Sequence, residues 1–238
     1  MSAGSPWAER AASLYDHSYA KRYRAHDDEF QSSAPCREFA EWLGGVCASF
    51  AAPIDVLDLG CGTGRYFWAL TGARSLIGLD ASPDMLEEAR HPYNAERITV
   101  PSISLTKGDL LTHRFDAGRF DLVYSIGVLA EHVPLDAALV ARVVEWLEPG
   151  GRFAFTTVHP ASSSIPKTLG RRIGEWIEPV TFGAARRGLR DRLLAGGLYA
   201  DELRVHELLD ARFVIESLER FVSEAHLHCL CVARKAGA

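Results

Sequence analysis

The central part of this chain alternates between short runs of apolar residues and longer amphipathic stretches. Apolar runs of about four to eight residues are typical of strands that are buried on both faces of a sheet. Because the stretches between them carry apolar residues at helical spacing, we predict an α/β fold in which helices cover both faces of a parallel sheet. The predicted strands are 55–59, 76–80, 102–107, 120–125 and 152–158, and the predicted helices begin at residue 65 or span 83–90 and 134–147.

The two ends of the chain add further helices and a pair of strands. The N-terminal region predicts two helical pieces: Tyr15, Tyr19 and Tyr23 fall on one stripe of the first, and Pro35 opens the second. Towards the C-terminus the pattern predicts a helix at 201–209 and closing strands at 213–218 and 227–233.

Between residues 160 and 200 the periodic pattern breaks, and glycines interrupt every helical stretch. A long irregular segment inside one domain is either a functional lid or a sign of misassigned elements, and its position after a strand favours a lid. Seven basic and three acidic side chains give it a net charge of +4, which either marks a solvated surface or attracts an anionic ligand. The basic residues are Lys167, Arg171, Arg172, Arg186, Arg187, Arg190 and Arg192.

The most informative stretch is 56–65, where the first predicted strand runs into glycines at every second position. Gly60, Gly62 and Gly64 can adopt positive φ angles and let a ligand approach the backbone closely. The loop is predicted to end at a helix N-terminus, whose N–H groups are available to a ligand. Such a loop by itself indicates only a nucleotide-type ligand, since dinucleotide oxidoreductases carry a similar one.

The spacing Gly-x-Gly-x-Gly, with Asp58 two residues ahead of it, resembles the first motif of class I S-adenosylmethionine-dependent methyltransferases. In that family the loop wraps the methionine moiety, and the acidic residue positions its amino group. The resemblance implies that Asp80, at the end of the next strand, accepts both ribose hydroxyl protons. It also implies that Asp109 accepts the adenine amino group while the N–H of Leu110 reaches the ring.

Later segments follow the family's order, since 120–125 resembles its fourth strand and 147–153 its turn into the fifth. The resemblance implies a Rossmann-like, doubly wound sheet of seven strands, mostly parallel with an antiparallel C-terminal strand. Cys61 and the tyrosine stripe are open to a second interpretation as packing residues. The remaining candidate cofactor contacts are Gly60, Cys61, Gly62, Gly64, Ala81, Ser125 and Tyr23.

We expect one domain over the whole chain. Its parts are an N-terminal helical cap (1–52), a cofactor-binding core (53–159), a substrate lid (160–200) and a C-terminal helix with strands (201–238).

Methyl transfer from a sulfonium is an in-line displacement, so the enzyme mainly has to align the acceptor and, where needed, remove its proton. His132 and His159 follow the fourth and fifth strands, whose carboxyl ends border the cleft in an open parallel sheet. Either imidazole is a candidate general base, and Glu131 is a candidate for orienting an acceptor amine. The alternative for His132 is a structural role at the start of the following helix. His226 and His228 are expected to be packing or surface residues.

The composition of the chain argues against nucleic acid and membranes as binding partners. A formal net charge of −5 gives no basic footprint for nucleic acid, and no run reaches the ~20 apolar residues of a membrane span. The N-terminus has no apolar signal-peptide core, so a cytoplasmic location is expected. Five scattered cysteines argue against a disulfide framework, and the sequence does not set the oligomeric state.

The sequence therefore predicts a methyltransferase that acts on oxygen, nitrogen or carbon of a small molecule, with an anionic acceptor as one option. No acidic cluster follows Ser125, so metal independence is expected. The competing interpretations are a nicotinamide oxidoreductase, a nonenzymatic regulator that binds S-adenosylmethionine, and a protein or RNA methyltransferase.

Overall fold

The computed structural model describes residues 5–30, 33–163, 165, 198–223 and 226–237. Its described strands form one seven-stranded sheet in the order β3-β2-β1-β4-β5-β7-β6. Strands β1 to β5 pair in parallel, whereas β7 runs antiparallel to both β5 and β6. The predicted doubly wound sheet with an antiparallel C-terminal strand is thereby confirmed. The strands are β1 (Ile54–Leu59), β2 (Ala73–Asp80), β3 (Ser102–Lys107), β4 (Phe120–Ser125), β5 (Leu147–Val158), β6 (Phe213–Ser223) and β7 (His226–Lys235).

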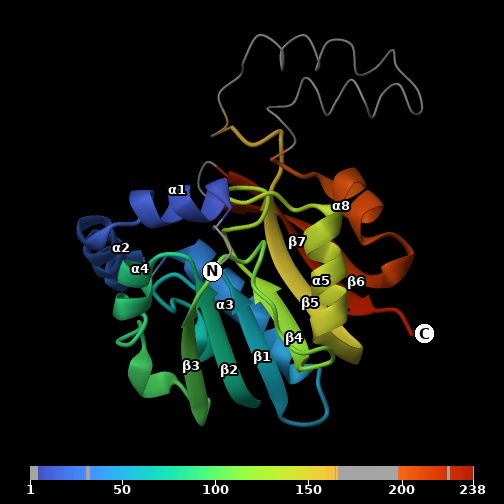
Figure 1. Ribbon diagram of the computed structural model, residues 1–238, viewed down its shortest axis with the longest axis horizontal. Coiled ribbons are helices and arrows are strands. Elements are labelled where there is room, and N and C mark those ends of the chain that lie inside the picture. Colours follow the sequence, from blue (N-terminus) through green and yellow to red (C-terminus); the bar gives the residue numbers. More distant parts are fainter. Residues whose placement is uncertain (1–4, 31–32, 164, 166–197, 224–225, 238) are drawn as a thin grey trace.

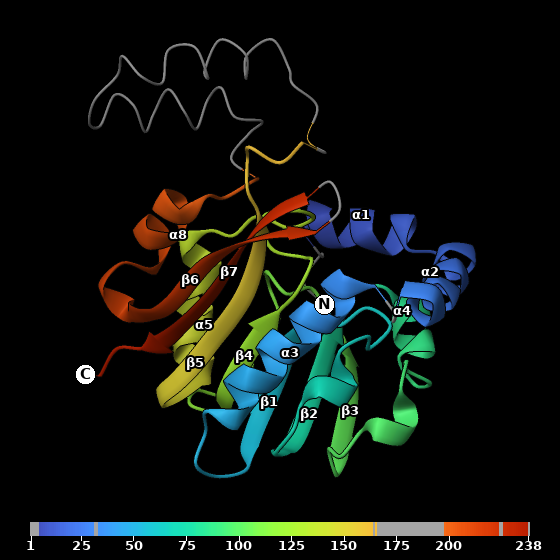
Figure 2. The same cartoon turned by 180° about the vertical axis from the view of Figure 1, so that it is seen from behind.

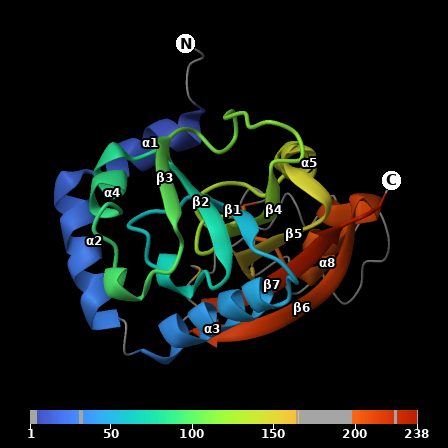
Figure 3. The ribbon, with the colours of Figure 1, turned by 90° about the horizontal axis from the view of Figure 1, so that it is seen from below.

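Helices cover both faces of the sheet (Figure 3). Helices α5 and α8 pack on one face in a core that includes Trp146, which is fully buried. Helix α3 packs on the other face, where Leu43 is fully buried (Figure 2). The α-helices are α1 (Pro6–Leu14), α2 (His17–Phe30), α3 (Ala34–Ala48), α4 (Pro83–Glu88), α5 (Ala137–Trp146) and α8 (Glu202–Leu209), with short 3₁₀ turns at Phe67–Ala69, Ala95–Arg97 and Asp210–Arg212.

The N-terminal region contains three helices where the sequence predicted two. The break falls after α1, whose C-cap is Tyr15, and the side chain of Asp16 then accepts a hydrogen bond from the Tyr19 N–H at 2.8 Å. A carboxylate in this position satisfies an N–H at the start of a helix, so Asp16 begins α2 as a separate element. Helix α1 consequently crosses the edge of the sheet at the carboxyl ends of the parallel strands (Figure 1).

The prediction of a helix from Arg65 is wrong. Only the 3₁₀ turn at Phe67–Ala69 forms there, because Gly72, at φ +75°, turns the chain into β2 at Ala73. The room between the glycine loop and β2 is too short for several helical turns. The helix predicted at 134–147 begins three residues later, because Asp136 caps it by accepting the Leu139 N–H at 2.8 Å.

The division of the chain into cap, core, lid and C-terminal part stays a prediction. Most of the predicted lid at 160–200, including every basic residue that motivated it, lies outside the described residues. Across the ranges that the structure does describe, no helix has the length and apolar character needed to cross a membrane.

Candidate active site

A cavity of about 450 Å³ lies at the carboxyl ends of β1, β2 and β4. Its walls come from α1, α2, α3, the glycine loop after β1, the segment after β4, and the hairpin of β6 and β7. In an open α/β sheet this edge is where ligands bind. The cavity therefore marks the candidate site.

The glycine loop is fixed to the neighbouring strand through its backbone. The N–H groups of Gly60 and Cys61 both donate to the carbonyl of Leu79, at 2.8 and 3.1 Å. A Cβ on Gly60 would lie 2.7 Å from a methyl group of Val128, so packing within the protein demands glycine there. Gly62 differs, because at φ +54° a Cβ would meet only the end of Met85 at 3.4 Å. Its backbone is thus left open to a ligand.

Asp58, at the end of β1, lies in the cavity wall and is almost completely buried. Its Oδ2 accepts a hydrogen bond from the Tyr124 hydroxyl at 2.6 Å. Burial raises the pKa of Asp58 to about 8, and the bond from Tyr124 only partly opposes this. A cation in the cavity would favour the carboxylate form, so the site suits a positively charged group.

Asp80, at the end of β2, organises the loop beside it. One carboxylate oxygen accepts the N–H of Gly62 at 2.9 Å, and the other accepts the N–H of Ser82 at 2.8 Å. Burial raises the pKa of Asp80 against the effect of these two bonds. Each oxygen retains a further lone pair, so the carboxylate can still accept two hydroxyl protons from a diol.

Asp109, just after β3, receives one N–H group from its own loop and one from a distant part of the chain. These come from Leu111 at 2.8 Å and from Ser5, ahead of α1, at 2.7 Å. Burial tends to raise the pKa of Asp109, but the hydrogen bonds outweigh it and the pKa is lowered. The contact with Ser5, which the sequence analysis missed, holds α1 over this end of the cavity.

The other predicted cofactor contacts divide into two groups. Cys61, Ala81 and Leu110 lie in the cavity wall. Ser125 does not, because it is fully buried and its hydroxyl donates to the carbonyl of Leu59 at 2.7 Å. The residue after it, Ile126, contacts the cavity instead.

Tyr23 lies in the cavity wall, and its ring makes a cation–π contact with Arg65. The guanidinium of Arg65 is 4.6 Å from the centre of its ring. Arg65 also donates to Asp27 of α2 at 2.5 Å, and Thr63 donates to the other oxygen of that carboxylate at 2.5 Å. This network, whose members Asp27 and Arg65 were missed, joins α2 to the end of the glycine loop. The nearby run of Tyr15, Tyr19 and Tyr23, which the sequence placed on one stripe, also lines the cavity.

Glu131 and His132 lie together in the segment after β4, and both line the cavity. The Nε2 atom of His132 is 3.5 Å from Oε1 of Glu131. Burial raises the pKa of Glu131 to about 7. Burial, followed by the nearby Arg10, lowers the pKa of His132. A carboxyl that titrates near neutral pH is able to exchange a proton with a bound acceptor.

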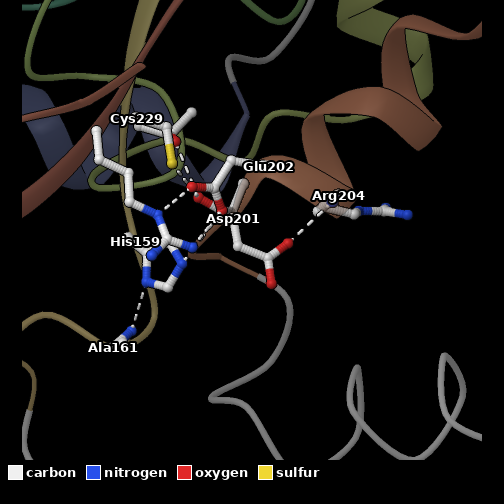
Figure 4. Close-up of polar contacts among 9 residues, drawn as sticks. His159, Ala161, Asp201, Glu202, Arg204 and Cys229 are labelled. Carbon is white, nitrogen blue, oxygen red and sulfur yellow. Dashed lines mark hydrogen bonds and ion pairs between the residues drawn. The ribbon is translucent and has the colours of Figure 1, made fainter. Parts of the chain in front are cut away.

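His159 is not among the residues that line the cavity. Its Nδ1 accepts the N–H of Ala161 at 2.9 Å, and its Nε2 is 3.4 Å from Glu202 at the start of α8 (Figure 4). Burial lowers the pKa of His159 although Glu202 opposes this. Through these contacts the imidazole links the end of β5 to the start of α8.

His226 and His228, expected to be packing or surface residues, both line the cavity. The strand topology could have predicted that these two histidines line the cavity. Because β7 runs antiparallel to β5, with Val158 opposite His228, the beginning of β7 lies at the same edge as the ends of the parallel strands. Sequence reasoning found the hairpin but did not follow this register.

The cavity thus offers carboxyl groups at the ends of three neighbouring strands. Asp58 suits a cation, Asp80 suits a diol, and Asp109 is an ionised acceptor for an amine. S-adenosylmethionine carries an ammonium, a ribose diol and an adenine amino group, and these residues fit it. Among the described residues, no group of three or more His, Cys, Asp or Glu side chains is arranged to hold a metal ion.

Comparisons with known proteins agree with this geometry. Residues 56–151 match the family model described as a methyltransferase domain. An aklanonic acid methyltransferase from Streptomyces sp. (strain C5) is 33% identical over 156 residues, which cover 60% of this chain and 68% of that protein. A bifunctional biotin biosynthesis protein from Bordetella avium is 34% identical over 151 residues, which cover 61% of this chain but only 31% of that longer protein.

A solved structure extends the similarity beyond the core. An S-adenosylmethionine-dependent methyltransferase from Mesorhizobium loti is 27% identical, with a TM-score of 0.57 over 82% of this chain and 98% of that one. The fold, the glycine loop and these matches together assign the cofactor. The chain belongs to the class I S-adenosylmethionine-dependent methyltransferases, and S-adenosylmethionine is its cofactor.

Proposed function

We propose that this enzyme methylates oxygen, nitrogen or carbon of a small-molecule acceptor and that it does so without a metal ion. The observation that carries the proposal is a single cavity in which three strand-end carboxyl groups adjoin a second end lined by aromatic and imidazole rings. Helix α1, held by Asp109 through Ser5, forms part of the cavity wall, and a site enclosed in this way favours a small acceptor. The relative named for aklanonic acid also supports a small-molecule acceptor.

The cofactor end is assigned to residues of β1, β2 and β3. Asp80 would accept the ribose hydroxyl protons, Asp58 would face the methionine amino group, and Asp109 with the Leu110 N–H would hold adenine. Tyr23 would close over the methionine end. The close backbone walls would come from Gly60, Cys61, Gly62 and Ala81, whereas Gly64 packs against the Phe67 ring and lies outside the described wall.

Methyl transfer breaks the bond between sulfur and the methyl carbon and forms a bond from that carbon to the nucleophile. The bound cofactor supplies the electrophilic methyl group on its sulfonium. Glu131 and His132 would act on the acceptor side, since they line the cavity and Glu131 titrates near neutral pH. Either residue would take the proton of a hydroxyl or amine acceptor. We assign no proton transfer to His159, whose imidazole lies outside the described cavity.

The charge of the acceptor is less constrained. The basic residues that favoured an anionic acceptor are outside the described residues. The described cavity wall contains the carboxyl groups of Asp58, Asp80, Asp109 and Glu131 but only one guanidinium, that of Arg65. This balance favours a neutral or cationic group at the reacting centre, and an anionic acceptor stays a prediction tied to the segment 160–200.

The proposal is tested with methyl-labelled S-adenosylmethionine and a small-molecule extract from cells that produce the protein. Label should enter a low-molecular-mass compound, and a chelator should not reduce the rate. The Glu131→Gln variant should lower the rate while leaving cofactor affinity unchanged. Label found only in protein or RNA, or activity that is lost to a chelator and restored by magnesium, would contradict the proposal. Tight binding without any transfer would favour a regulator.

A further inference from the structure

The end of the cavity farthest along the sheet from Asp109 is formed by the hairpin of β6 and β7. Ser223 ends β6, and His226 and His228 begin β7, so all three reach the edge where α1 crosses the sheet (Figure 2). The sheet order places this hairpin beyond β5, on the opposite side of β1 from β2 and β3. It therefore lies outside the part assigned to adenine and ribose and borders the acceptor space.

His228 is held rigidly in this wall. Only 7% of its surface is exposed, and its ring packs edge-on against Phe39 of α3 with 5.4 Å between the ring centres. Its Nε2 is 2.9 Å from the hydroxyl oxygen of Ser223. Its Nδ1 is buried, and the described residues provide no hydrogen-bond partner for it.

The unpartnered nitrogen indicates which tautomer is present. A buried N–H without an acceptor is costly and rare, whereas an acceptor with an unused lone pair is tolerated more often. We therefore place the lone pair on Nδ1 and the proton on Nε2, from which it is donated to Ser223. Burial, and then the neighbouring His226, lowers the pKa of His228 to about 4, so the ring stays neutral at physiological pH.

The tautomer determines what Ser223 can do. Because its oxygen accepts the His228 proton, its own hydroxyl hydrogen is not used in that contact and can be donated to a ligand. Ser223 is 8% exposed and lines the cavity. Its hydroxyl is thus a fixed donor at the wall of the acceptor space.

Aromatic rings continue from this donor into the cavity. Phe39, which touches His228, also packs edge-on against Tyr66, with ring centres 6.4 Å apart, and both line the cavity. The charge nearby is balanced, since the guanidinium of Arg65 is paired with Asp27. The surface here suits a flat, uncharged body that presents an oxygen lone pair.

We propose that Ser223, oriented by His228, donates a hydrogen bond to an oxygen atom of the acceptor, and that the acceptor is an uncharged, oxygen-bearing aromatic molecule packed against Phe39 and Tyr66. This inference rests on the proposed small-molecule function. Within it, Ser223 binds the acceptor directly, while His228 is a positioning residue that acts through Ser223.

The test uses 1-naphthol as a neutral probe and 1-naphthoate as its anionic counterpart, titrated calorimetrically into the enzyme saturated with S-adenosylhomocysteine. Naphthol should bind more tightly than naphthoate. Ser223→Ala should weaken naphthol binding by about five-fold, the loss of one hydrogen bond, without changing S-adenosylhomocysteine affinity. The matched control is Ser217→Ala, earlier on β6 and outside the cavity wall, which should bind naphthol normally.

The positioning role of His228 has its own readout. His228→Leu should weaken naphthol binding as much as Ser223→Ala, whereas His228→Gln, which keeps an N–H donor near the Nε2 position, should restore part of it. Nitrogen chemical shifts of the imidazole should report the Nε2–H tautomer in the unliganded enzyme. An Nδ1–H tautomer would contradict the assignment, because Ser223 would then be donating to His228.

The outcomes separate this inference from the function on which it rests. Failure of S-adenosylhomocysteine to bind the wild-type enzyme would overturn both. If S-adenosylhomocysteine binds, three outcomes would overturn the inference alone. These are no binding of naphthol at millimolar concentration, weaker binding of naphthol than of naphthoate, and equal naphthol affinity in the Ser223→Ala and wild-type enzymes.

Discussion

The two ends of the cavity are built in different ways. At the cofactor end, Asp80 and Asp109 accept N–H groups from residues two positions later, Ser82 and Leu111. At the acceptor end the contacts join distant elements, as when the ring of His228 on β7 packs edge-on against Phe39 of α3, with 5.4 Å between the ring centres. Local turns thus orient these two carboxylates, to which Gly62 and Ser5 add N–H groups from farther along the chain, whereas the acceptor space exists only once α3 and the hairpin have packed. Disturbing each end should therefore have a different signature.

The largest effect is expected from the buried ion pair that joins α2 to the glycine loop. Asp27→Ala removes a carboxylate that is 1% exposed and leaves Arg65 without this partner in a mostly buried site. Loss of one member of a buried pair costs about 3–5 kcal/mol of stability. Denaturant unfolding would measure it. The control is Asp28→Ala, whose side chain is 59% exposed and which should cost no more than about 1 kcal/mol. Equal losses would show that the pair does not hold α2.

The next effect concerns the backbone facing the cofactor. Gly62→Val should reduce S-adenosylhomocysteine affinity by at least about 100-fold, because a β-branched residue resists positive φ and its side chain would enter the cavity. Gly72→Val is the matched control: it has a similar positive φ of +75° but lies outside the cavity. It should lose stability and keep cofactor affinity. A Gly62→Val enzyme that binds normally would place the cofactor elsewhere.

A smaller effect should appear in the pH dependence of cofactor binding. The pKa of Asp58 is raised to about 8 in the unliganded protein, so the carboxyl is protonated below that pH. The ammonium of the cofactor stabilises the carboxylate, so binding releases a proton and affinity rises with pH. The slope should reach at most about ten-fold per pH unit below pH 8 and then level off.

Calorimetry in buffers of different ionisation enthalpy would count the released proton. Asp58→Asn should flatten the pH dependence, while Glu131→Gln, which removes another carboxyl in the cavity wall whose pKa is raised, to about 7, should leave it in place. If the slope survives in Asp58→Asn, the methionine amino group does not face this residue.

The same contrast explains which parts of the structure the sequence predicted. Strands β3 and β4 begin and end where the apolar pattern placed them. Asp58, Asp80 and Asp109 lie in the cavity wall because each is at or just past a strand end, which a short motif reveals. Local errors arose where a turn or cap overrode periodicity, as at Gly72 and Asp16.

The contacts between distant elements were not predictable in this way. The position of His228 depends on an antiparallel register with β5, and the position of Asp27 depends on how α2 packs on the loop. Neither is encoded in a contiguous motif. His159, by contrast, was predicted because it follows a strand at the edge where the cavity lies. Its contacts with Ala161 and Glu202 instead link the end of β5 to α8.

The central claim is that the carboxyl group of Asp80 binds the ribose of the cofactor, and one titration tests it directly. S-adenosylhomocysteine should bind the wild-type enzyme with micromolar affinity, and Asp80→Ala should weaken binding by roughly 1–3 kcal/mol through loss of charge-assisted hydrogen bonds. Asp84→Ala, in the adjoining helix α4 and outside the cavity wall, is the matched control and should bind as the wild type does. Equal affinity in the wild-type and Asp80→Ala enzymes would contradict the account.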